Sequence, residues 1–243
     1  MCGRFTLTRK DSRALASELG AAFEGADAPL YRPRYNIAPT DQHWIVREKQ
    51  ERRQLLPAKW GLVNSWAHHP KGAARQINAR SESALTRPAF HEAFEKRRCA
   101  VPADGFFEWI GTKEARRPIW FHAPDGGLML FAGLYESWRD PKTEAWMRTF
   151  TILTTGANKT VEPVHDRMPV ILPPEGIDTW LHRPVRTAEA YAEGLRALLV
   201  PAAEGVLIAT EVSRRVNAVS NDDEACLAPA DNSELTAETP RLF

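Results

Sequence analysis

The sequence has few cysteines, and their spacing does not suggest a cross-linked or metal-bound fold. Its three cysteines, Cys2, Cys99 and Cys226, are spread over 243 residues and form no CxxC pair. An odd number of widely spaced cysteines argues against a disulfide framework and against a structural zinc site. We therefore expect no metal and no cofactor, and a reducing, cytoplasmic environment.

Long apolar segments are also missing. No stretch approaches the roughly 20 apolar residues that a membrane-spanning helix needs. The first residues lack the apolar run behind a basic segment that marks a signal peptide. With 43% hydrophobic and 26% charged residues, the composition is that of a soluble globular protein with enough apolar material for a core. These features predict no association with membranes.

Internal repeats, low-complexity tracts and long linkers are absent too, and short apolar segments make up most of the chain. Strand-like runs lie at 43–47, 53–60, 98–102, 106–110, 118–123, 128–135, 148–154, 168–172 and 206–213, and helical patterns at 12–23, 87–97, 175–183 and 187–199. The turn sequence "PDGG" predicts a hairpin that joins two of the central strands. Central strands with marginal helices favour a single α+β domain with a curved, mostly antiparallel, barrel-like sheet. The polar C-terminal end predicts a flexible tail over 226–243.

Charge is unevenly distributed although the net charge is only +1. Residues 71–117 hold ten Lys and Arg against six Asp and Glu, whereas residues 203–243 hold three Arg against eight acidic residues. The basic middle could present a surface to a phosphate backbone. A solvated surface of mixed charge would have the same composition, so charge alone does not decide between the two.

The opening segment "MCGRF" places a cysteine at position 2. If Met1 is removed, Cys2 carries an α-amine and a thiol on adjacent carbons. An α-amine with a pKa of about 7.7–8.0 is partly neutral at physiological pH, and a neutral amine condenses with an aldehyde to an imine. The adjacent thiol can then close a five-membered thiazolidine ring. On its own, Cys2 could equally be an inert residue that follows Met1.

Two ionisable residues stand in apolar surroundings. Glu108 in "DGFFEWI" lies between Phe107 and Trp109, so it is either a surface carboxylate on the opposite face or a desolvated acid suited to proton transfer. His165 in "VHDRMPVIL" precedes a buried-looking strand. It is either a satisfied structural histidine or an acid–base group that titrates near neutral pH.

Amide side chains occupy two further segments, "YNIAPT" and "INARSE". Asn36 and Asn78 could simply stabilise turns, because asparagine readily bonds to nearby backbone. In an extended segment, however, Asn78 and Arg80 project on the same side. An amide beside a guanidinium is suited to holding a sugar and its phosphate.

The segments "MCGRF", "YNIAP", "WGL", "INARSE", "DGFFEW" and "HDRMPVIL" occur in this order. Together they resemble the SRAP family (SOS-response-associated peptidase) over residues 2–221. Each motif is common alone, but six in order from the N-terminus are specific. The resemblance implies an SRAP domain over 1–225. Members of that family include abasic site processing proteins that shield damaged single-stranded DNA.

The resemblance also implies a mechanism and a site. The α-amine of Cys2 would attack the aldehyde of an abasic site and the thiol would close the ring, which leaves a covalent DNA–protein crosslink; a lyase-like activity and autoproteolytic removal of Met1 would fit the family. The residues implied in catalysis are Cys2, Asn36, Asn78, Glu108 and His165, and those implied in DNA binding are Arg4, Pro39, Trp66, Arg80 and Arg167. By position, Glu108 would assist imine formation and ring closure, and His165 would open the sugar and promote reversal. The implied partner is single-stranded DNA with abasic sites, bound by a monomer in the cytoplasm or at the nucleoid.

Several alternatives stay open at this stage. An N-terminal-nucleophile hydrolase, of the peptidase or glutamine amidotransferase type, also uses a cysteine after Met1. A zinc nucleobase deaminase needs HxE and PCxxC motifs, which the sequence lacks. A non-enzymatic DNA-binding module would need neither Glu108 nor His165. The segments "VNSW" and "VNAVSN" differ from common family patterns, and this difference bears on DNA affinity.

Overall fold

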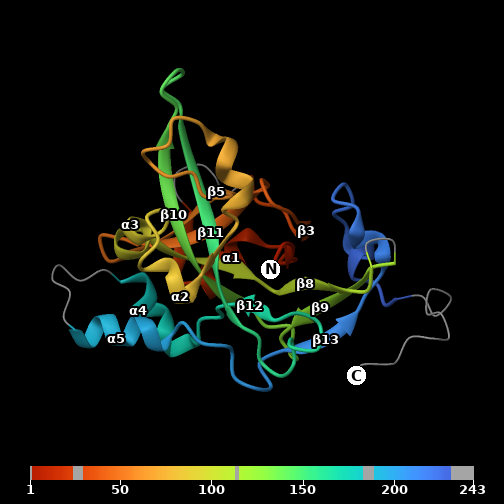
Figure 1. The fold of residues 1–243 in the computed structure, drawn as a ribbon. Helices are drawn as coiled ribbons and strands as arrows, with labels where there is room; N and C mark the ends of the chain where they lie inside the picture. The colour runs from red at the N-terminus through yellow and green to blue at the C-terminus, as the bar shows by residue number, and fades with distance from the viewer. Residues whose placement is uncertain (1, 24–29, 113–114, 183–188, 231–243) are drawn as a thin grey trace.

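A closed β-barrel forms the centre of the computed structural model, which describes residues 2–23, 30–112, 115–182 and 189–230 (Figure 1). Its strands are β4 (Gln42–Lys49), β5 (Arg52–Trp60), β7 (Arg98–Ala103), β10 (Met129–Arg139) and β11 (Trp146–Gly156). Antiparallel pairing runs in the order β5-β4-β7-β10-β11, and a short parallel pairing of β11 with β5 closes the ring. The expectation of a single α+β domain with a mostly antiparallel, barrel-like core is confirmed.

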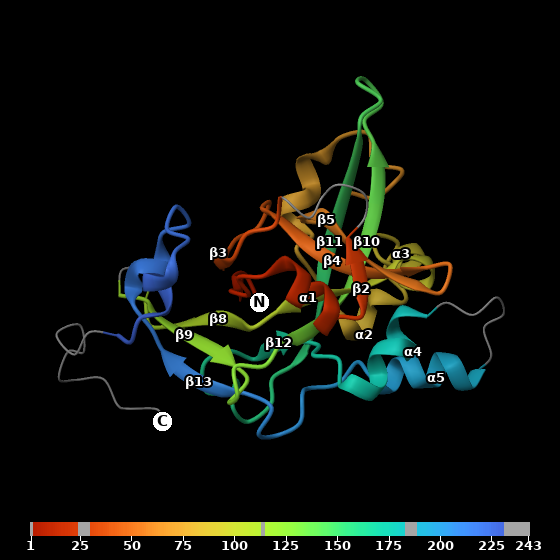
Figure 2. The same cartoon turned by 180° about the vertical axis from the view of Figure 1, so that it is seen from behind.

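A second, five-stranded antiparallel sheet lies against the barrel and contains the N-terminal strand (Figure 2). Its order is β13 (Ile208–Glu211), β9 (Arg117–His122), β8 (Gly105–Ile110), β1 (Phe5–Leu7) and β3 (Arg34–Ile37). Three short strands extend the barrel sheet: β2 (Ala21–Phe23) beside β5, and β6 (Asn78–Arg80) and β12 (Arg167–Pro169) on opposite sides of β11.

Short helices surround the two sheets. The α-helices are α1 (Ser12–Glu18), α2 (Ser81–Ala84), α3 (His91–Lys96), α4 (Ile177–Leu181) and α5 (Glu189–Ala197). The 3-10 helices are η2 (Pro70–Arg75), η3 (Pro174–Gly176), η4 (Arg214–Asn217) and η5 (Glu224–Leu227). No helix in the described ranges is long and apolar enough to cross a membrane.

The predicted hairpin at "PDGG" is wrong. The turn itself forms, since the Gly126 amide donates to the Ala123 carbonyl and the Gly127 amide donates to Asp125. The strands on its two sides nevertheless enter different sheets, because β9 pairs with β8 and β13 whereas β10 pairs with β7 and β11. Turn residues indicate that the chain reverses locally, but they do not determine with which other strands the two flanking strands pair.

Two other expectations differ at their boundaries. The helix predicted over 12–23 ends at Glu18, where Gly20 takes a left-handed conformation with φ +57° that ends helices, and the chain continues as β2. Within the segment 226–243, Cys226 is buried in η5 and Pro229 pairs with Val212. Residues 231–243 of the expected tail lie outside the described residues.

Phe5 fixes the N-terminal strand to the barrel. Its fully buried ring makes edge-to-face contacts with His43, Trp60 and Phe131, at centroid distances of 4.7, 5.0 and 6.2 Å. Such aromatic pairs contribute about 0.5–1.5 kcal/mol each beyond the burial of their area. Cys2 lies only three residues away, so this cluster determines where the N-terminus sits.

Asp104 holds the same strand by hydrogen bonds. This buried carboxylate accepts from the Thr6 hydroxyl at 2.5 Å and from the amide and hydroxyl of Thr8, both at 2.6 Å. The next residue, Gly105, has no space for a side chain, since a Cβ would lie 1.9 Å from the Trp120 indole nitrogen. The turn between β7 and β8 therefore bonds to the N-terminal strand through Asp104 and packs tightly against Trp120 at Gly105.

Replacing Asp104 tests this anchoring. We expect Asp104→Asn to destabilise the protein by about 2–3 kcal/mol, because a charged acceptor is lost and the new amide group faces the Thr8 amide donor. Urea unfolding followed by tryptophan fluorescence measures the difference. Asp125→Asn is the matched control at an exposed turn carboxylate. Equal effects of the two substitutions would show that Asp104 does not anchor the strand.

Candidate functional site

The N-terminal residues continue β1 alongside β8. Phe5 pairs with Phe106, and the Phe107 amide donates to the Arg4 carbonyl at 3.0 Å. Continued by two residues, this antiparallel register places Gly3 opposite Glu108. Sheet pairing thus brings the start of the chain beside the acidic residue that the sequence singled out.

Cys2 is fully buried and its thiol is neutral at physiological pH. Burial raises the pKa of the thiol well above its usual range, and the negative charge of Glu108 raises it further. The Cys2 sulfur approaches the Arg4 carbonyl at 3.9 Å. A thiol in this state is a poor nucleophile until a base removes its proton.

Asn78 contacts Cys2 directly. Its Nδ2 donates to the Cys2 carbonyl at 2.7 Å, and β6 holds it there by pairing with β11 at Ile152. The side-chain oxygen of Asn78 is buried and has no hydrogen-bond partner among the described residues. Native structures seldom leave such an atom unsatisfied, so the amide oxygen is available to a bound molecule.

Glu108 is only 5% exposed, which decides between the two interpretations of this residue in favour of the desolvated acid. Burial raises the pKa of Glu108 to about 7, and the positive charge of the chain's amino terminus lowers it in part. A carboxyl group that is half ionised near neutral pH can both donate and accept a proton.

His165 is half-buried, and its pKa is lowered first by burial and then by the positive charge of the amino terminus. Its Nδ1 accepts the Arg167 amide at 2.9 Å, which leaves the proton of the neutral ring on Nε2. Asp166 lies 3.0 Å from the same Nδ1, but it is 87% exposed and so interacts weakly with the ring. The negative charge of Asp166, the next residue, raises the pKa of Glu108, so the segment that carries His165 lies near Glu108.

Asn36 and Arg4 form a unit that holds the C-terminal segment. The buried Asn36 accepts from Arg4 at 2.7 Å and donates to the carbonyls of Val216, Ala218 and Asn221. Its hydrogen bonds are thereby used in fixing this loop, and its side chain contacts Arg4 rather than Cys2. The guanidinium of Arg4 also lies 5.7 Å from the Trp109 ring centroid, a cation–π contact.

Arg80 and Arg167 flank β11 from β6 and β12. Arg80 is exposed, whereas both terminal nitrogens of Arg167 bind the carboxylate of Glu82, at 2.5 and 2.9 Å. Sequence reasoning missed Glu82, although it stands in "INARSE" two residues after Arg80. Its partner Arg167 stands 85 positions away in the sequence, so no local pattern marked this ion pair.

The two remaining residues of the predicted DNA surface lie at the periphery. Trp66 is 65% exposed and Pro39 is half-buried, and no described interaction joins either of them to Cys2. In the divergent segment "VNSW", Asn64 is buried and donates to the Ala89 carbonyl at 2.6 Å. The part of the chain that the structure describes contains no cluster of His, Cys, Asp and Glu that could hold a metal ion.

Comparison with known proteins identifies the family. The family model described as "SOS response associated peptidase (SRAP)" matches residues 1–219. The chain belongs to the SRAP family. It is 35% identical to the abasic site processing protein YoqW of Bacillus subtilis over 225 residues, which cover 91% of this chain and 96% of that protein.

Other SRAP relatives extend across kingdoms. The abasic site processing protein YedK of Escherichia coli is 32% identical and matches 94% of this chain and all of that protein. The chicken protein HMCES is 30% identical and matches 82% of this chain and 67% of its own length. A crystal structure of a Bacteroides thetaiotaomicron protein has the same fold, with a TM-score of 0.82 at 22% identity over 94% of this chain and all of that one.

The raised pKa of Glu108 makes a prediction about stability. Because the carboxyl has a pKa of about 7 in the folded protein and 4.5 ordinarily, ionising it disfavours folding increasingly as pH rises from 4.5 to 7. We expect Glu108→Gln to be nearly neutral at pH 4.5 and to stabilise the SRAP domain by on the order of 1–3 kcal/mol at pH 8. Urea unfolding at a series of pH values measures this.

Glu82→Gln is the control of opposite sign. The bonds from Arg167 lower the pKa of Glu82, so its contribution to stability is present above pH 4.5 and is lost as pH falls through the lowered pKa. Glu82 is exposed, so its removal should destabilise the protein at pH 8 by less than about 1 kcal/mol. A Glu108→Gln protein that is destabilised at pH 8 would contradict the assignment of a desolvated carboxyl.

Proposed function

We propose that this SRAP protein processes abasic sites in single-stranded DNA by forming a covalent thiazolidine crosslink through Cys2 after removal of Met1. The observation that carries the proposal is the position of Asn78 and Glu108 beside the start of the chain. Asn78 donates to the Cys2 carbonyl, and the register of β1 with β8 places the buried Glu108 opposite Gly3. The naming of curated relatives as abasic site processing proteins supports the same conclusion.

The reaction begins at the amine because the buried thiol is neutral. The α-amine of Cys2 adds to the aldehyde carbon of the opened sugar, and loss of one water gives an imine. The thiol sulfur then bonds to the imine carbon while the thiol proton passes to the imine nitrogen, which closes the ring. One water is released overall, and no oxidant or reductant is required.

Glu108 and His165 supply the proton transfers. Glu108 can protonate the departing hydroxyl, recover a proton from the amine nitrogen as the imine forms, and then relay the thiol proton to the imine nitrogen, since its pKa is about 7. The Nε2–H of neutral His165 can donate to the sugar ring oxygen as the ring opens, and the same group can assist reversal. The unpartnered oxygen of Asn78 can accept a hydrogen bond from the amine or the sugar and so orient the lesion.

Arginines on both sides of β11 would hold the DNA backbone. The exposed Arg80 can bind a phosphate directly, while Arg167 would exchange its Glu82 partner for a phosphate, and Arg4 is positioned by Asn36. The exposed ring of Trp66 can stack on an unpaired base, and Pro39 can offer a second apolar surface. Association with DNA as a monomer is part of this proposal.

The hydrolase alternative makes a different use of the same thiol. An N-terminal-nucleophile hydrolase attacks its substrate with sulfur and uses its own α-amine as the base, so the raised pKa of the Cys2 thiol fits both reactions, and crosslinking to abasic DNA separates them. The peptidase label of the family then fits the removal of Met1, which frees the amine for the proposed chemistry.

Crosslinking to a defined strand tests the proposal. We expect the purified protein, mixed with a single-stranded oligonucleotide containing one abasic site, to give a species that survives denaturing electrophoresis, and we expect Cys2→Ala to give none. Cys2→Ser keeps the amine but lacks the thiol, so its imine should appear only when it is trapped with borohydride.

Cys99→Ala is the matched control, since Cys99 is an equally buried cysteine in the barrel. It should crosslink as the wild type does. Turnover of a peptide or of glutamine by the wild type, without any covalent species on abasic DNA, would refute the proposed function in favour of the hydrolase.

A further inference from the structure

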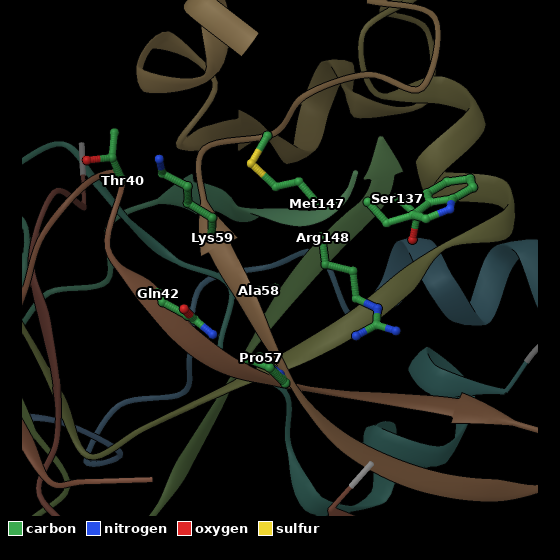
Figure 3. A pocket seen from close by; sticks show the side chains of 9 residues that line it. Thr40, Gln42, Pro57, Ala58, Lys59, Ser137, Met147 and Arg148 are labelled. Carbon is green, nitrogen blue, oxygen red and sulfur yellow. The ribbon is translucent and has the colours of Figure 1, made fainter. Parts of the chain in front are cut away.

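An open pocket lies at the mouth of the barrel (Figure 3), and Cys2 is not among the residues that line it. The parallel pairing that closes the barrel covers only the Lys59–Thr149 and Trp60–Phe150 positions. Before these positions β5 and β11 separate, and the space between them has a volume of about 830 Å³. The pocket is thus a direct consequence of how the barrel closes.

The lining of this pocket is basic and polar. Lys59 and Arg148 contribute cationic side chains from β5 and β11, and Gln42 contributes an amide from β4 (Figure 3). No Asp or Glu is among the described residues that line it. Lys59 is exposed and forms no ion pair with any other described residue, so it can neutralise a phosphate without first breaking a contact.

An aromatic ring completes the lining. Trp146, near the end of the β10–β11 hairpin, lines the same pocket and is 70% exposed. A large exposed indole is costly to leave in water, and every base offers it a flat face. Cations that track a phosphate backbone together with an aromatic platform are the features by which proteins bind single strands.

A short chain segment links the pocket to the candidate site. Thr40 lines the pocket, its amide donates to the Trp60 carbonyl at 2.9 Å, and it directly follows Pro39. The same segment begins at Asn36, which bonds to Arg4. Roughly 10 Å of extended chain separates Asn36 from Pro39, so a strand held at Cys2 needs to extend by only a few nucleotides to reach the pocket.

We propose that this pocket is a second binding subsite, which takes a nucleotide of the single strand that flanks the abasic site. A backbone phosphate lies against the exposed Lys59, and the base stacks on Trp146. The inference rests on the proposed function, because it requires the strand to be held at Cys2. If the subsite exists, the affinity for single-stranded DNA increases with the length of the strand, whereas the reaction at Cys2 alone does not require this increase.

Strand length provides the test. Fluorescence anisotropy measures the binding of single-stranded oligonucleotides of about five and about fifteen nucleotides. Each carries a central stable abasic analogue that cannot form an aldehyde. The two lengths lie near the lower and upper ends of common single-strand site sizes. We expect the long strand to bind more tightly to the wild type. Trp146→Ala should reduce that advantage about fivefold or more, and Trp146→Phe should restore most of it. Lys59→Ala should reduce the slope of the logarithm of the binding constant against the logarithm of the salt concentration by the amount expected for about one phosphate contact.

Lys49→Ala is the matched control, because Lys49 is an exposed lysine at the other end of β4. It should bind both strands as the wild type does. Full retention of the long-strand advantage in Lys59→Ala and Trp146→Ala would overturn the inference, and so would its absence in the wild type. Thymidine monophosphate that binds as tightly as the long strand would identify a free-nucleotide site and also overturn it. Crosslinking of the short strand by the wild type, with a natural abasic site, tests the proposed function separately.

Discussion

The burial of Phe5 is the constraint on which the site depends. Its ring sits against His43, Trp60 and Phe131, and these residues come from three different barrel strands. Chain termini usually fray because little holds them. Here the aromatic cluster and the hydrogen bonds to Asp104 fix residues 5–8, so the three residues before them have a defined path along β8. A reactive group at the end of a chain needs such an anchor.

The site places its acid where ionisation is costly. Glu108 is buried between β1 and β9, and its carboxyl keeps a pKa of about 7 because water is excluded. The same exclusion of water raises the pKa of the Cys2 thiol and keeps it neutral. Residues that are tuned for proton transfer commonly reduce the stability of the protein that holds them. The barrel offsets this cost, and so do the hydrogen bonds that Tyr35 and Asn36 of β3 donate to Asn221 and Asp222 in the C-terminal segment.

Local chemistry could be predicted from the sequence, but long-range pairing could not. The aminothiol of Cys2 and the α+β class follow from residue types and periodicity. Barrel closure depends on two residue pairs of β5 and β11 about 90 positions apart, and no local pattern marks them. Alternation left the direction of Glu108 open until its register beside Gly3 was known. The ion pair of Glu82 with Arg167 and the loop-fixing bonds of Asn36 likewise join distant segments.

Peptide mass spectrometry of the crosslinked protein tests the central claim most directly. After digestion of both the protein and the DNA, the account predicts that the sugar remnant lies on a peptide that begins at Cys2, with Met1 absent. The mass of this peptide should be that of its parts less one water, and its thiol should be protected from alkylation. A remnant on a lysine, or a crosslinked peptide that still carries Met1, would contradict the account.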